Sequence, residues 1–117
     1  MLIELEKYHG VANWMSSTKD GRIKCAYIDM TDFSNAFPDL YPKCIDDFNS
    51  QHVDVPGGVT YCRYGFPAGV DDAIQDRWIV GWDYAHDVDV VMGHKKPVFD
   101  KKIILDIRKV IDNLPEI

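Results

Sequence analysis

The last part of the chain has a hydrophobic repeat with the period of a helix. Asp100 is suited to cap the first turn and Pro115 to end the helix, while lysine and arginine residues fall on the opposite side. A helix with so broad an apolar stripe needs a sheet to pack on. The stripe consists of Ile103, Ile104, Ile107, Val110, Ile111 and Leu114.

Earlier in the chain the pattern changes to the alternation that is typical of β-strands. Residues 22–28 alternate polar with apolar side chains, which puts Ile23, Cys25 and Tyr27 on one face of a strand. The preceding Asp20-Gly21 pair predicts a tight turn, so we expect the partner strand between residues 10 and 17.

Two further strands are predicted in the second half. Residues 77–83 are apolar on both faces, as in a central strand, and Gly81 indicates close approach of another backbone or a ligand. Gly57 and Gly58 precede a shorter strand over residues 59–64. The whole pattern predicts one α+β domain over residues 1–117, a small antiparallel sheet of about four strands with the C-terminal helix packed on one face.

Residues 31–53 have no regular pattern. The Phe37-Pro38 and Tyr41-Pro42 pairs exclude a regular helix across them, because proline lacks an amide hydrogen and restricts the residue before it. We expect a long surface connection, with a short helical turn over residues 44–48 as the one regular piece. Such connections often carry function. Its aromatic anchors would be Phe33, Phe37, Tyr41 and Phe48.

Composition changes this picture in a few respects. The 117 residues, 46% hydrophobic, suffice for one globular core. No apolar run approaches the roughly 20 residues of a membrane helix, and acids stand where a signal peptide needs a basic start. We therefore expect a cytosolic protein with no membrane partner. The net charge of −6 makes nucleic acid an unlikely ligand.

The charges are unevenly distributed along the chain. Acids dominate residues 29–54 and 71–89, whereas bases gather after residue 95. This asymmetry would steer a cationic partner toward the acidic part, and solvated loops are the alternative explanation. Cys25, Cys44 and Cys62 show no metal-binding or redox spacing, so we expect free thiols.

One polar cluster follows the predicted central strand. Asp83, His86, Asp87 and Asp89 lie within seven residues. Carboxylates with an imidazole suit a divalent cation or proton transfer. The alternative is a turn in which the aspartates cap backbone amides. Similarly, Gly57-Gly58 lets a ligand approach the backbone or simply makes a tight turn. Phosphate-loop, Rossmann, serine-hydrolase and zinc-protease motifs do not occur.

The two motifs together resemble a family of small phage and prophage proteins. That family has an Asp-x-His-Gly-Gly-x-Thr-Tyr segment, which is similar to residues 54–61, and a Trp-x-Ile-Gly-Phe-Asp-x-Ala-His-x-Gly-Asp segment, which is similar to residues 78–89. Pro56 stands where the family has histidine and Val88 where it has glycine, which weighs against an enzymatic role. The matching residues are Gly57, Gly58, Thr60, Gly81, Asp83, Ala85, His86 and Asp89.

The resemblance implies a genetic setting, a bacteriophage or prophage, and a candidate site, but no reaction. The small size, the missing catalytic motifs, the acidic stretches and Pro56 in place of histidine then favour a viral accessory protein that acts in the host cell cytosol in counter-defence. We expect a non-enzymatic protein that inhibits a host or defence-system protein or sequesters a small nucleotide-like signal. It would have no catalytic residues, and a divalent metal is the one cofactor that its polar cluster would suit. The expected ligand-binding residues are Gly57, Gly58, Thr60, Asp83, His86 and Asp89.

Two alternatives remain open at this point. The first is a metal-assisted hydrolase or nuclease in which Asp83, His86 and Asp89 hold the cation that activates water. The second is a DNA mimic, for which a net charge of −6 over 117 residues is low.

Overall fold

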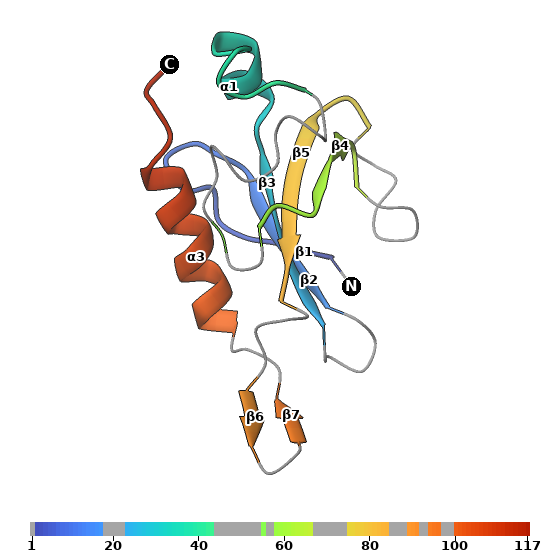
Figure 1. Ribbon diagram of the computed structural model, residues 1–117. Coiled ribbons are helices and arrows are strands. Elements are labelled where there is room, and N and C mark those ends of the chain that lie inside the picture. Colours follow the sequence, from blue (N-terminus) through green and yellow to red (C-terminus); the bar gives the residue numbers. More distant parts are fainter. Residues whose placement is uncertain are drawn as a thin grey trace.

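The computed structural model confirms an α+β fold with a five-stranded antiparallel sheet and a C-terminal helix packed on it (Figure 1). The structure describes residues 2–17, 23–43, 55, 58–66, 75–84, 89–91, 94–96 and 100–117, with only the backbone for 89–91 and 94–96. The sheet order is β1–β2–β3–β5–β4. The bounds are Leu2–Glu4 for β1, Asn13–Ser17 for β2, Lys24–Asp29 for β3, Tyr61–Tyr64 for β4 and Trp78–Asp83 for β5.

The predicted hairpin pairing is confirmed. β2 and β3 pair antiparallel, with Met15 opposite Ala26 and Ser16 opposite Cys25. The predicted Asp20-Gly21 turn lies outside the described residues. β5 lies between β3 and β4, and its residues from Trp78 to Trp82 are buried. The prediction missed β1, because a three-residue edge strand is too short to show an alternating pattern.

Helix α3 (Asp100–Asp112) lies along one face of the sheet (Figure 1). Four residues of the predicted stripe are buried, and Ile104 and Leu114 are half-buried. They pack on side chains that β3 and β5 direct to this face, such as Ala26, Ile28 and Val80. The buried stripe residues are Ile103, Ile107, Val110 and Ile111.

A hydrogen-bond chain ties α3 to the end of β5. The Trp82 indole Nε1 donates to the Tyr84 hydroxyl at 3.0 Å, and that hydroxyl donates to Asp106 Oδ2 at 2.8 Å. Lys102 binds the same carboxylate at 3.1 Å, and its ammonium lies 5.5 Å from the centre of the Tyr84 ring. Trp82 and Tyr84 are buried. These directional hydrogen bonds therefore fix the position of α3 along the sheet, which apolar packing alone would not do.

The opposite face of the sheet carries a smaller hydrophobic cluster, made of the aromatic residues Trp14, Tyr27 and Phe66 together with Ile79. The close approach of another backbone that Gly81 predicted is confirmed here. A Cβ atom at Gly81 would lie 2.5 Å from Tyr27 Cδ1 and 2.8 Å from the Ala26 carbonyl oxygen. The neighbouring strand does come close, but the space above Gly81 is occupied by the Tyr27 ring, not by a ligand.

The long connection after β3 begins with a helix that the sequence did not predict, α1 (Thr31–Ala36). Asp29 Oδ1 accepts hydrogen bonds from the Thr31 amide at 3.0 Å and hydroxyl at 2.7 Å, which starts the helix. Arg77 Nε donates to the other oxygen of Asp29 at 2.8 Å. This stabilising partner lies 48 residues away, so no local pattern reveals it.

The aromatic anchors of the connection are confirmed where they are described. Tyr41 is buried, and Phe33 and Phe37 are half-buried against the main core. Helix α1 ends just before Phe37-Pro38, as the proline requires. Phe48 and the predicted turn over residues 44–48 lie outside the described residues.

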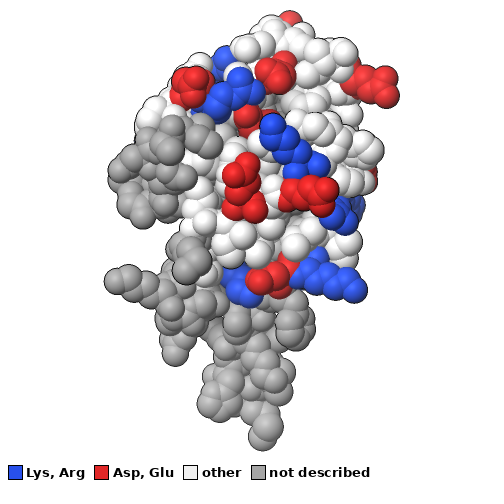
Figure 2. Space-filling view, turned by 180° about the vertical axis from the view of Figure 1, so that it is seen from behind, with Lys and Arg blue, Asp and Glu red and all other residues white. Residues whose placement is uncertain are grey.

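The acidic stretches are partly neutralised in the fold. Arg77 binds Asp29 and also lies 3.5 Å from Asp32. On the face seen in Figure 2, basic and acidic side chains are interspersed. Cys25 and Cys62 are free thiols, as expected. Within the described residues, no helix has the length and apolar character needed to cross a membrane.

The contact between Tyr27 and Gly81 predicts the effect of a single methyl group. Gly81→Ala should lower the free energy of unfolding by about 1–3 kcal/mol, because the Tyr27 ring must leave its place. Urea denaturation measures the change. Adding Tyr27→Leu should reverse part of the loss that Gly81→Ala causes, since the smaller side chain leaves room for the methyl group. A Gly81→Ala protein as stable as the wild type would contradict this assignment.

Candidate functional site

The predicted ligand residues that the structure describes lie near one end of the sheet. Asp83 ends β5, is half-buried, and lies opposite Cys25 of β3. The Thr60 amide donates to the Gly81 carbonyl at 3.0 Å, which places the exposed Thr60 beside the same end of β5. Gly58 has φ +78° and its amide donates to the Val55 carbonyl at 3.0 Å, so this glycine closes a turn before β4.

The other members of this predicted site are not described. Gly57 and His86 lie outside the described residues, as do Ala85 and Asp87. Asp89 begins β6 (Asp89–Val91), which pairs with β7 (His94–Lys96), but its side chain is not described. Among the described residues, no three histidine, cysteine or acidic side chains gather to hold a metal ion. The metal or ligand site at this end of the sheet therefore stays a prediction.

A small polar group surrounds Asp83 on the face opposite α3. Burial raises the pKa of the Cys25 thiol, and the nearby Asp83 charge raises it further, while hydrogen bonds with Tyr27 and Ser16 act in the other direction. Burial likewise raises the pKa of Tyr27. Both shifts favour the neutral forms, the thiol of Cys25 and the phenol of Tyr27.

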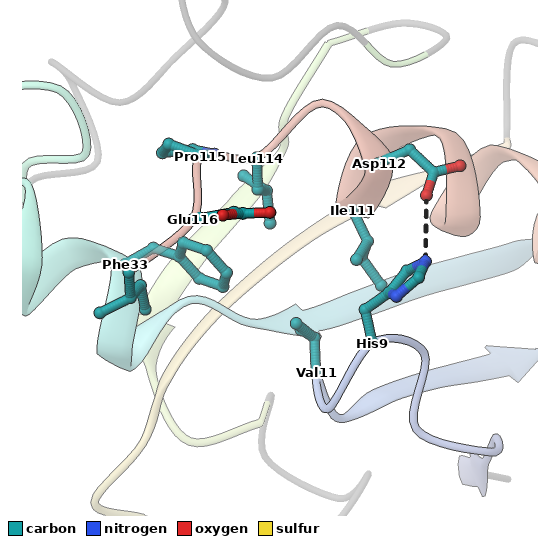
Figure 3. A pocket seen from close by; sticks show the side chains of 9 residues that line it. His9, Val11, Phe33, Ile111, Asp112, Leu114, Pro115 and Glu116 are labelled. Carbon is teal, nitrogen blue, oxygen red and sulfur yellow. Dashed lines mark ion pairs between the residues drawn. The ribbon is translucent and has the colours of Figure 1, made fainter.

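A second candidate site, which the sequence did not predict, lies at the C-terminal end of α3. Here a cavity of about 560 Å³ opens between the end of the helix, α1 and the turn before β2 (Figure 3). Six of its nine lining residues have apolar side chains, but polar and apolar atoms contribute about equally to its surface. The polar residues are His9, Asp112 and Glu116. The apolar residues are Val11, Phe33, Ile111, Leu114, Pro115 and Ile117.

A two-residue turn presents His9 to this cavity. Tyr8 and Val11 form a bridge with reciprocal amide-to-carbonyl hydrogen bonds of 3.2 and 2.9 Å. His9 and Gly10, between them, have φ +48° and +78°, the sign that a type I′ turn requires at both positions. Among the described residues, His9 is the only non-glycine residue with positive φ. Non-glycine residues rarely adopt this conformation, and those that do are often found at functional sites.

Asp112 joins this turn to the last turn of α3. Its Oδ2 accepts a hydrogen bond from the Tyr8 hydroxyl at 3.2 Å, and its Oδ1 lies 3.6 Å from His9 Nε2 (Figure 3). The bond to Asp112 is the main cause that raises the pKa of Tyr8. The Arg108 guanidinium lies 5.3 Å from the centre of the Tyr8 ring. These contacts join the turn that carries His9 to the last turn of α3, and both segments contribute residues to the cavity.

The sequence after α3 forms the remaining wall. The amides of Asn113 and Leu114 donate to the carbonyls of Val110 and Ile111, both at 3.1 Å, which tightens the end of the helix. Pro115 then turns the chain away, so that Leu114 and Glu116 both line the cavity (Figure 3). The His9-Gly10 pair is the local sequence signal for the turn. His9 and Asp112 are 103 residues apart in the sequence, so their contact could not be predicted from a local pattern.

A cavity of this size that combines apolar side chains with a few polar groups is a candidate binding site, although its surface is more polar than that of a typical small-molecule pocket. The polar groups fix the orientation of what enters, and the apolar walls supply the contact area. In comparisons with protein-family models, with curated proteins and with solved structures, nothing matches this chain.

The raised pKa values of Cys25 and Tyr27 predict a loss of stability at high pH. Above their unfolded-state pKa values, near 8.5 and 10, the unfolded chain releases these protons while the folded protein retains them. The free energy of unfolding should therefore fall by up to about 1.4 kcal/mol per pH unit for each retained proton. Urea denaturation from about pH 8 to about pH 11 measures this slope, and Tyr27→Phe should reduce it above about pH 10. An unchanged slope in that variant would contradict the assignment.

Proposed function

We propose that this chain is a non-catalytic accessory protein of a phage or prophage, which binds and blocks a protein of the host cell or of its defence system. The genetic setting and the place of action in the host cytosol rest on the family resemblance of residues 54–61 and 78–89. The binding role rests on one observation, the cavity at the end of α3, whose surface is shared about equally by polar and apolar atoms.

The geometry of the cavity supports binding without large rearrangement. Tyr8, His9 and Asp112 already contact one another across the rim, so a partner would meet an ordered surface. Pre-organisation of this kind lowers the conformational entropy that association costs. Its volume is large enough for one or two side chains of a partner protein, the kind of anchor on which most protein interfaces depend.

Charge favours a protein partner over a nucleotide-like signal at this cavity. The carboxylates of Asp112 and Glu116 would repel phosphate groups. Sequestration of a small signal remains the alternative, and it would use the other end of the molecule, near Gly58, Thr60 and Asp83. A thermal-shift screen with nucleotide signals tests it, because a hundredfold excess over the dissociation constant should stabilise the protein by about 2.7 kcal/mol.

Filling the cavity should abolish binding to the partner. We predict that Leu114→Trp keeps the fold, since Leu114 follows the end of α3 and is only half-buried. The variant should lose the host protein that the wild type retains on affinity purification, because Leu114 lines the cavity. The matched control is Leu105→Trp, the same exchange at a residue of α3 that is 53% exposed and does not line the cavity.

The comparison is made by quantitative mass spectrometry of the captured proteins, followed by titration of the purified partner. The expected dissociation constant is at least tenfold higher for Leu114→Trp and unchanged for Leu105→Trp. Circular dichroism and thermal unfolding establish that both variants are folded. Equal binding by both folded variants would contradict the proposal.

A further inference from the structure

We infer that the occupant of the cavity is a basic side chain of the partner protein, with arginine the best fit. This inference rests on the function proposed above and adds the chemistry of recognition. It comes from two features that occur together at this cavity, an excess of carboxylates at the rim and an aromatic and aliphatic wall beneath them.

The rim has an excess of negative charge. Asp112 and Glu116 both line the cavity, from the last turn of α3 and from the segment after Pro115 (Figure 3). Among the described lining residues, only His9 can become positive, and it lies 3.6 Å from one oxygen of Asp112. The side chain of Asp112 is 52% exposed, so it can meet a second cation. A cation therefore complements this rim.

The walls suit the apolar part of such a side chain. Phe33, Ile111 and Leu114 line the cavity together, and they would contact the three methylene groups of an arginine. The guanidinium would then reach the carboxylates at the rim. Two of its N–H groups can donate to the two oxygens of one carboxylate. A cation near the Phe33 ring adds attraction to the face of that ring.

The same chemistry already occurs next to the cavity within the protein. Arg108 places its guanidinium 5.3 Å from the centre of the Tyr8 ring, and the hydroxyl of that ring binds Asp112. The Tyr8 ring, the Arg108 guanidinium and the Asp112 carboxylate are thus combined beside the cavity, where Tyr8 and Arg108 are not among its lining residues. A partner arginine would repeat the combination on the inner side, with Phe33 as the ring and Glu116 as the carboxylate.

The test uses the full chain, labelled with nitrogen-15, and two probes of equal shape. Benzamidine carries an amidinium like that of arginine, whereas benzamide is its neutral counterpart. We expect benzamidine to shift the amide signals of His9, Val11 and residues 111–114, with a dissociation constant at least tenfold lower than that of benzamide. Glu116→Gln should reduce the difference between the dissociation constants of the two probes. Added salt should weaken the binding of benzamidine but not that of benzamide.

The same variant is then compared in binding to the captured partner. Glu116→Gln should weaken that complex at least threefold, whereas a neutral exchange outside the cavity, Leu105→Gln, should not. Equal binding of the two probes, or signal changes confined to other parts of the protein, would overturn the inference. So would preferential binding of benzamidine without any loss of partner in Glu116→Gln, because the site would then bind small amidinium ligands and not the partner.

Failure of the inference and failure of the proposed function give different results. If Leu114→Trp loses the partner but benzamidine does not bind in the cavity, the cavity is an interface, and the inference that a basic side chain occupies it is wrong. If Leu114→Trp retains the partner, the proposed function fails whatever the probes do.

Discussion

The structure depends on the packing of α3 against the sheet. Ile103, Ile107 and Ile111 enter the main core, and each is at most 5% exposed. Apolar packing sets the distance between helix and sheet but allows sliding along the helix axis. The bonds from Tyr84 to Trp82 and Asp106 remove that freedom, because their buried atoms would otherwise lose their partners. The position of every residue at the end of α3 follows from this arrangement.

The candidate binding cavity is a consequence of where α3 ends. Its last turn reaches the Tyr8–Val11 turn, so that Asp112 can bind Tyr8 and face His9. The segment that Pro115 begins lines one side of the cavity, and Phe33 of α1 lines another. The result is a cavity with two carboxylates, in a chain whose net charge of −6 would also attract a basic partner over longer distances.

The sequence predicted those elements that depend on a repeated local pattern. The stripe of α3 and the two-sided burial of β5 are confirmed, and so is a strand at β3. The alternation predicted for that strand is not, because Ala26, Tyr27 and Ile28 are all buried and the exposed Ile23 precedes the strand. Features that depend on distant partners were missed. Asp29 starts α1 with the support of Arg77, and the Tyr27 ring fills the space over Gly81. The cavity belongs to the second kind, because His9 and Asp112 meet only in the fold. Of the predicted ligand residues, the structure brings Thr60 and Asp83 toward one sheet end, while a role for them remains a prediction.

The central claim is that the partner binds at the end of α3. Amide hydrogen exchange, followed with and without the captured host protein, tests it most directly because it reports on both candidate sites at once. Binding at the cavity predicts slower exchange at residues 8–11 and 111–117, with residues 58–60 and 83–84 unchanged. Slower exchange at residues 58–60 and 83–84 alone would contradict the claim and place the interface at the other end of the sheet.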